Sequence, residues 1–117
     1  MREYDKLVRD RIPEIIEKEG RPFGTSTVTG DGLLFYLDKK LDEEIGEFRE
    51  SRDPEELADV MEVVFAMAAS LGVSEKELMD IRCEKKEKRG GFEKGIVLDW
   101  TDRCRREYDK TIVQFPS

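Results

Sequence analysis

Four carboxylates in the middle of the chain are spaced so that they could hold a divalent metal ion. Glu44 and Glu47 are three residues apart, and Glu56 and Asp59 repeat this spacing after the Asp-Pro break at residues 53–54. Residues three or four apart share one face of a helix, so each pair projects its oxygens in one direction. If the two helices run antiparallel, the two pairs can meet and form a cation site.

The alternative interpretation is that these acids only form solvated helix faces. Asp and Glu make up 28 of the 117 residues, and in so acidic a chain an accidental match to the pattern is expected about once. Two features favour a metal site: both pairs lie on helices joined by a tight break, and Asp59 lies among apolar residues. A buried, ionised carboxylate is costly unless a hydrogen bond, a basic side chain or a metal ion compensates it. The pattern alone leaves both interpretations open.

The first acidic pair lies on a segment with helical periodicity. Apolar residues recur every three or four positions from Leu33 to about Arg49, which predicts an amphipathic helix. On that helix Glu44 falls at the edge of the apolar stripe and Glu47 lies one step further round, whereas Glu43 is expected nearer to solvent.

Helix-start and helix-stop signals divide the rest of the chain. Asp10 and Pro13 predict the start of a short helix that ends at Gly20. The Asp-Pro pair at 53–54 predicts a helix that runs to Gly72. Because this second helix is apolar almost all round, we expect it to be largely buried.

The remaining elements complete an all-α prediction with minor short strands. An S-x-x-E capping-box pattern at 74–77 opens a third long helix, which ends at the double glycine at 90–91. The stretches 92–100 and 111–115 look extended. A chain of this length without a repeat or linker fits one domain, residues 1–117, whose modest core a partner subunit could complete.

The composition excludes several classes of function. The formal charge of −7 disfavours binding to a polynucleotide. The chain has no apolar run long enough for a membrane span or a signal peptide, so we expect a cytoplasmic protein without a membrane partner. It contains no histidine, which removes the commonest general base and the usual zinc ligand. Cys83 and Cys104 lack C-x-x-C spacing, which argues against a structural zinc site.

An all-carboxylate ligand set suits Mg²⁺ or Mn²⁺ rather than zinc or copper, and Mg²⁺ usually serves phosphates. Lys85 and Arg89, four residues apart near a helix end, are candidate phosphate partners. They could equally interact with the helix dipole and with neighbouring acids. Lys40, one turn before Glu44, is either a substrate contact or only an ion-pair partner of that acid, and Arg9 is similarly ambiguous.

Four blocks of the sequence together resemble the MazG-like branch of the all-α nucleoside triphosphate pyrophosphohydrolase superfamily. These blocks cover about residues 4–98 and read "YDKLVRDRIPEIIEKEG", "KKLDEEIGEF", "EELADVMEVVFAMAASLG" and "EKKEKRGGFEKGIVL". The resemblance implies an antiparallel helical bundle that assembles as a homodimer or homotetramer. It also implies hydrolysis of a nucleoside triphosphate to the monophosphate and pyrophosphate, including house-cleaning of non-standard nucleotides.

The same resemblance implies roles for individual residues. The family's E-E-x-x-E and E-x-x-D motifs, which hold Mg²⁺, match Glu43, Glu44, Glu47, Glu56 and Asp59, of which the last four correspond to the ligands. The family's K-x-x-x-R motif matches Lys85 and Arg89 and implies contacts to substrate phosphates, to which Lys40 is added as a candidate. The implied reaction is attack of an activated water on the α-phosphorus, with Glu44, Glu47 or Glu43 as the general base.

Two related alternatives and two departures accompany this resemblance. Phosphoribosyl-ATP pyrophosphohydrolases of histidine biosynthesis share the acidic pattern, and a non-catalytic helical interaction module would also fit it.

Gly46 interrupts the acidic helix, where it either permits close helix packing or marks a loosened site. The segment from about Asp99 has no counterpart in the family. Tyr36, Phe92 and Trp100 are candidates for stacking on a base, with core or interface packing as the alternative.

Overall fold

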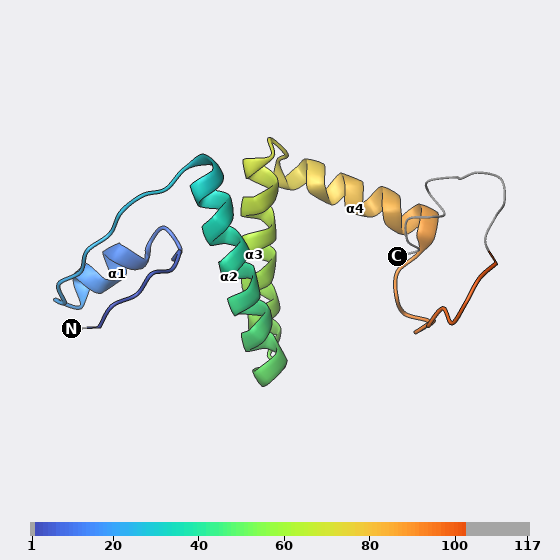
Figure 1. Ribbon diagram of the computed structural model, residues 1–117, viewed down its shortest axis with the longest axis horizontal. Helices are drawn as coiled ribbons and strands as arrows, with labels where there is room; N and C mark the ends of the chain where they lie inside the picture. Colours follow the sequence, from blue (N-terminus) through green and yellow to red (C-terminus); the bar gives the residue numbers. More distant parts are fainter. Residues whose placement is uncertain (1, 103–117) are drawn as a thin grey trace. The chain divides into compact units, whose positions relative to one another are not determined.

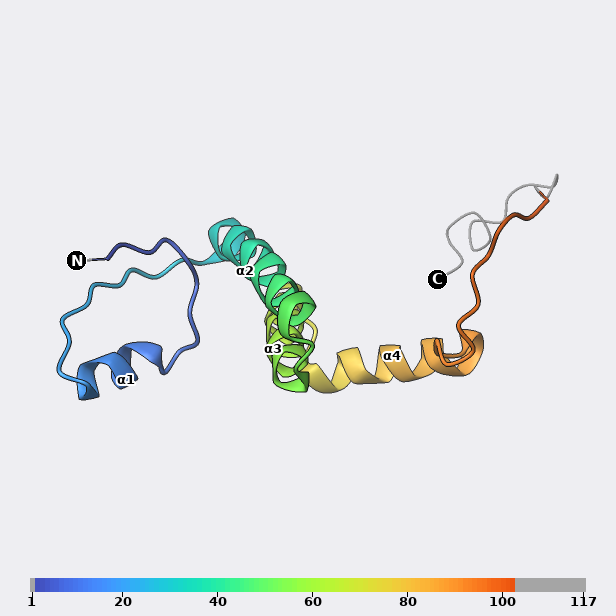
Figure 2. The same cartoon turned by 90° about the horizontal axis from the view of Figure 1, so that it is seen from below.

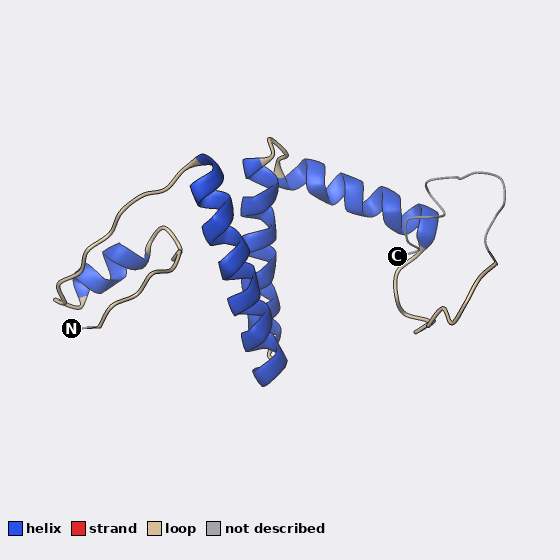
Figure 3. Ribbon diagram, in the orientation of Figure 1, coloured by secondary structure: helices blue, strands red, loops and turns tan. Residues whose placement is uncertain are grey.

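The computed structural model describes residues 2–102, which fold into helices joined by turns and loops (Figure 1). The helices are α1 (Ile12–Lys18), α2 (Gly30–Ser51), α3 (Pro54–Ser70) and α4 (Glu75–Arg89). No strand occurs in this part of the chain (Figure 3), so the all-α prediction is confirmed for it. The chain divides into two units, residues 1–78 and 79–117. The expectation of a single domain stays a prediction.

The centre of the first unit is an antiparallel hairpin of α2 and α3, which lie side by side in both views (Figures 1 and 2). Arg52 ends α2 with a left-handed backbone, φ 59°, and its N–H donates to the Phe48 carbonyl at 2.7 Å. The Asp53 side chain then accepts from the Glu55 N–H at 3.0 Å, with Pro54 in the first turn of α3. The predicted Asp-Pro break is therefore confirmed, and it brings the two acidic pairs onto adjacent helices.

The other helix boundaries follow the local signals closely. The capping box at the start of α4 is formed, because Glu77 N–H donates to Ser74 Oγ at 3.1 Å and Ser74 N–H donates to Glu77 Oε1 at 3.0 Å. Two details differ from the prediction. Helix α2 begins at Gly30, a turn before Leu33, and the residue that precedes α1 is Arg11 rather than Asp10.

The apolar core of the described residues is thin, since only Leu37, Val63 and Ala68 are buried apolar side chains. The expectation that α3 is largely buried is wrong for the described residues, because only Val63 and Ala68 of this helix are buried. Within the first unit α2 covers one face of α3, while Leu57 and Met61 on another face remain 46% and 50% exposed. A helix that is apolar all round has more surface than a single partner helix can cover.

The predicted extended segment at 92–100 is also corrected. These residues form turns and irregular chain, and Ile96 and Val97 are about four-fifths exposed. A strand needs a neighbouring backbone to take its hydrogen bonds, and this segment has no such neighbour among the described residues. The second stretch, 111–115, and Cys104 lie outside them, whereas Cys83 is exposed on α4. No single described helix has the length and apolar character required to cross a bilayer.

Candidate metal centre

Three of the four predicted ligands meet across the α2–α3 hairpin. Glu44 from α2 and Glu56 and Asp59 from α3 each offer a carboxylate oxygen, and these oxygens lie within 4.8 Å of one another. We call these three residues the carboxylate trio. Glu44 is only 7% exposed, and the other two are half-buried. The prediction that the two acidic pairs meet is therefore confirmed for three of their members.

The hairpin directs these side chains inward because of where they fall on each helix. Glu44 follows the buried Leu37 by seven residues, which places both on one face of α2. On α3, Asp59 precedes the buried Val63 by four residues and shares its face. The trio thus lies on the surfaces that the two helices use to pack together.

Glu44 has an unusual electrostatic environment for a buried acid. Its Oε1 lies 3.3 Å from the Lys40 ammonium. Its Oε2 is buried and has no hydrogen-bond donor among the described residues. Leaving a buried acceptor unpaired costs about 1–3 kcal/mol, more for a charged group. A bound cation would remove that cost, and three carboxylates suit a hard ion such as Mg²⁺ or Mn²⁺, so the residues present fit the predicted cofactor.

The remaining predicted ligand, Glu47, lies one turn beyond Glu44 on α2 and is exposed, outside the trio. The negative charge of Glu47 nonetheless affects the pKa of Glu56. Burial raises the pKa of Glu56 above its ordinary value, and the negative charges of Glu47, Asp59, Glu44 and Asp53 raise it further. This is the behaviour expected of a carboxylate crowded by like charges.

Basic side chains balance part of this negative charge. Arg9, from the segment before α1, donates from Nη2 to Asp59 Oδ1 at 2.6 Å. Lys40 donates to Glu43 Oε2 at 2.7 Å, and burial, which alone would lower the pKa of Lys40, is outweighed by Glu43 and Glu44, which raise it. Lys40 therefore stays protonated while largely shielded from solvent.

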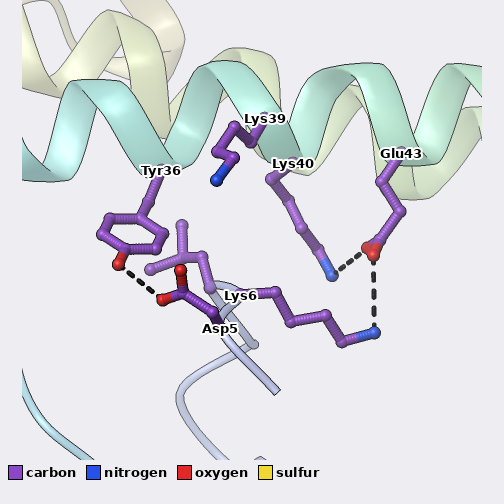
Figure 4. Close-up of a pocket in the computed structure, with 7 residues that line it drawn as sticks. Asp5, Lys6, Tyr36, Lys39, Lys40 and Glu43 are labelled. Carbon is purple, nitrogen blue, oxygen red and sulfur yellow. Dashed lines mark hydrogen bonds and ion pairs between the residues drawn. The ribbon is translucent and has the colours of Figure 1, made fainter. Parts of the chain in front are cut away.

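Glu43 is held between two lysines, Lys40 and Lys6, the latter at 3.4 Å (Figure 4). The hydrogen bond from Lys40 is the largest cause that lowers the pKa of Glu43 below its ordinary value. The expectation that Glu43 lies nearer to solvent than Glu47 is wrong, because the Glu43 side chain is 29% exposed and only partly accessible, whereas Glu47 is exposed. The N-terminal segment covers it, and helical periodicity carries no information about such a cover.

The contribution of the N-terminal segment was only partly visible in the sequence. Arg9 was an ambiguous candidate, and Lys6 and Asp5 were not candidates at all. Asp5 accepts a hydrogen bond from the Tyr36 hydroxyl at 2.6 Å, which is the largest cause of the raised pKa of Tyr36. All three residues lie within residues 4–13, at the start of the first block that carries the family resemblance. Their shared presence in this charged segment ahead of α1 is the signal that could have identified them.

The candidate phosphate partners Lys85 and Arg89 lie in the second unit, exposed on the last two turns of α4. Phe92 and Trp100 are exposed in the same unit. Tyr36, in the first unit, is half-buried on α2. The roles proposed for the second unit's residues at the trio stay predictions.

Comparison with known proteins adds little to this site. No family model matches the chain, and no solved structure matches it. A protein of Mycolicibacterium smegmatis, described as an uncharacterized protein, is 50% identical over 44 residues. That match covers 38% of this chain and 45% of the relative, so it spans less than half of either protein.

Proposed function

We propose that the protein is a Mg²⁺-dependent nucleotide pyrophosphohydrolase of the MazG-like kind, which converts a nucleoside triphosphate to the monophosphate and pyrophosphate. The observation that carries this proposal is the buried Glu44 carboxylate, which clusters with Glu56 and Asp59 and has one oxygen without a donor among the described residues. The sequence resemblance supplies the substrate class. A solvated acidic face, the alternative, would not bury one carboxylate oxygen without a donor.

The carboxylate trio would hold Mg²⁺ or Mn²⁺. When bound there, the ion would supply positive charge to the phosphates and acidify a water molecule. Arg9 fixes Asp59 through one of its oxygens and leaves the other free to act as a ligand. Lys40, Lys85 and Arg89 are the proposed contacts to substrate phosphates.

Among the candidate bases, Glu47 is the group best placed to accept a proton. It is exposed to solvent, and its charge acts on Glu56 of the trio. Glu43 is the weaker base, because two lysines hold its pKa low, and Glu44 is committed to the trio. In the proposed reaction a water gives its proton to Glu47, its oxygen bonds to the α-phosphorus, and the bond between that phosphorus and the bridging oxygen breaks to release pyrophosphate.

The protein is proposed to work as a homodimer or homotetramer. Three apolar residues with the spacing i, i+4 and i+7 are exposed on α3: Leu57, Met61 and Val64. Within residues 2–102 nothing covers this apolar face and few apolar side chains are buried, and a second copy of the chain would bury the face. Sedimentation or light scattering of the purified chain measures this directly.

The function is tested by measuring pyrophosphate release from standard and modified nucleoside triphosphates and from phosphoribosyl-ATP, with and without Mg²⁺. We expect metal-dependent turnover that both Glu44→Gln and Asp59→Asn abolish. Glu62→Gln is the matched control, because it removes one negative charge from an exposed position of α3 outside the trio. Preference for phosphoribosyl-ATP would assign the histidine-biosynthesis reaction. A folded oligomer that turns over none of these substrates would favour a non-catalytic interaction module.

A further inference from the structure

A small pocket lies between the N-terminal segment and the first half of α2 (Figure 4). Its volume is about 130 Å³. The residues that line it are Asp5, Lys6, Leu7, Tyr36, Lys39, Lys40 and Glu43. Three lysines against two carboxylates give the lining a net positive charge, although the chain as a whole carries −7.

Of the three lysines in this pocket, Lys39 has the fewest interactions that neutralise its positive charge. Its ammonium lies 4.8 Å from the centre of the Phe35 ring and 5.8 Å from that of Tyr36. Among the described residues no carboxylate forms an ion pair with it. Contact with a ring face satisfies the charge without using the N–H donors fully, so the ammonium can still donate to an anion.

Lys40 connects the pocket to the carboxylate trio. Its ammonium lies 2.7 Å from Glu43 Oε2, in the pocket lining, and 3.3 Å from Glu44 Oε1, in the trio. The side chain is only 15% exposed, so this bridging charge is held in place by its surroundings. An anion that touches Lys40 from the pocket side is therefore next to the candidate metal centre.

The size of the pocket limits what it can take. Sites for drug-sized ligands are about 300–1,000 Å³, and this pocket is smaller than a nucleoside requires. A cationic lining with several ammonium donors suits a phosphate group.

We propose that this pocket binds the terminal phosphates of the substrate, so that Lys6, Lys39 and Lys40 hold the pyrophosphate that leaves. This inference rests on the proposed function for the identity of the substrate. The anion site itself is measurable without any turnover, because pyrophosphate alone is a suitable probe.

Binding of pyrophosphate is linked to the metal by charge. The pocket and trio with Arg9 contain four basic and five acidic groups, which leave a net charge of −1. The basic groups are Lys6, Arg9, Lys39 and Lys40, and the acidic groups are Asp5, Glu43, Glu44, Glu56 and Asp59. One divalent cation at the trio converts this to +1. Pyrophosphate therefore binds more tightly in the presence of Mg²⁺ than in its absence.

The test is isothermal titration calorimetry of pyrophosphate into the full chain, with and without Mg²⁺. Lys39→Gln should weaken pyrophosphate binding at least about tenfold, because a hydrogen bond to a charged group is lost. Lys18→Gln makes the same change of charge at an exposed position of α1, outside the pocket, and should leave binding unchanged. The Mg²⁺ affinity of the Lys39→Gln protein should be no weaker than that of the wild type, which shows that the trio is intact.

Asp5→Asn is a second test variant, and it should change the pyrophosphate affinity in the opposite direction. It removes one negative charge from the lining, and the amide oxygen can still accept from Tyr36. Pyrophosphate should then bind several-fold more tightly, a gain that a folding defect cannot produce.

Equal affinities of the Lys39→Gln and Lys18→Gln proteins, or absence of pyrophosphate binding by the wild type, would overturn the inference. So would unchanged or weaker binding by Asp5→Asn. Lysine-dependent binding without turnover of any nucleotide would overturn the proposed reaction but leave the anion site standing. Normal turnover by the Lys39→Gln protein, together with an unchanged pyrophosphate affinity, would overturn the anion site but leave the proposed reaction standing.

Discussion

Glu44→Gln should have opposite effects on the stability of the metal-free protein and on its response to metal. The substitution keeps the shape of the side chain and removes its charge. Without a metal ion the buried Oε2 has no donor among residues 2–102, which costs about 1–3 kcal/mol. A glutamine in its place removes one negative charge from a cluster whose carboxylate oxygens lie within 4.8 Å of one another, so the repulsion between them falls.

The same substitution also removes a favourable contact with Lys40, but the stability lost with that contact is small. Lys40 gives up a 3.3 Å contact with Glu44 but keeps its 2.7 Å hydrogen bond with Glu43, so about 1 kcal/mol is lost. The metal-free Glu44→Gln protein should therefore be between equally stable and about 2 kcal/mol more stable than the wild type. For a chain of this size that corresponds to a rise in Tm of up to roughly 8 °C.

In the presence of Mg²⁺ the wild type should become more stable than the Glu44→Gln protein. A ligand at a hundred times its Kd stabilises the folded state by about 2.7 kcal/mol, which corresponds to roughly 10 °C in Tm. The wild type should show that rise and Glu44→Gln should not, as followed by circular dichroism or calorimetry with and without Mg²⁺. Glu62→Gln should behave as the wild type does in both conditions. A Glu44→Gln protein that is markedly less stable without metal, or that gains as much from Mg²⁺ as the wild type, would refute this reasoning.

Three further predictions concern neighbouring positions on α2. Gly46→Ala should raise stability by up to about 1 kcal/mol in thermal unfolding, because an added Cβ meets no atom within 4 Å; a loss would show that another surface packs there. Glu43→Gln should lower stability fully above the ordinary pKa of a glutamate and not at all below the pKa of Glu43 in the folded protein, which is lowered, because the contribution of the charge is lost as the pH falls through that lowered value; a difference in Tm that persists in acid would contradict the ion pair with Lys40. Glu47→Gln should reduce kcat by at least about a hundredfold while leaving Mg²⁺ affinity unchanged, as expected for a general base; a parallel loss of Mg²⁺ affinity would make Glu47 a fourth ligand instead.

The sequence predicted the helix boundaries well because the signals that set them are local. Asp53 and Ser74 cap α3 and α4 through hydrogen bonds to groups no more than three residues away. The meeting of Glu44 with Glu56 and Asp59 was predicted only on the condition that the two helices run antiparallel, which the short break after α2 permits. Spacing placed these three acids on the facing sides of the helices but did not show that Glu47 lies outside the trio.

What could not be predicted depends on contacts between distant parts of the chain. The ion pair of Arg9 with Asp59 joins residues 50 positions apart, and that of Lys6 with Glu43 joins residues 37 apart. Periodicity shows which face of a helix is apolar but not whether anything covers it. For that reason Glu43 was expected to be more exposed than it is, and α3 was expected to be more buried than it is.

The proposed reaction requires above all that the carboxylate trio is a cation site. Titration of Mn²⁺ into the wild-type protein, followed by the electron paramagnetic resonance signal of the free ion, measures this without any substrate. We expect saturable Mn²⁺ binding that Asp59→Asn removes and Glu62→Gln leaves unchanged. Equal Mn²⁺ binding by the wild type and Asp59→Asn, or no saturable binding by the wild type, would contradict it.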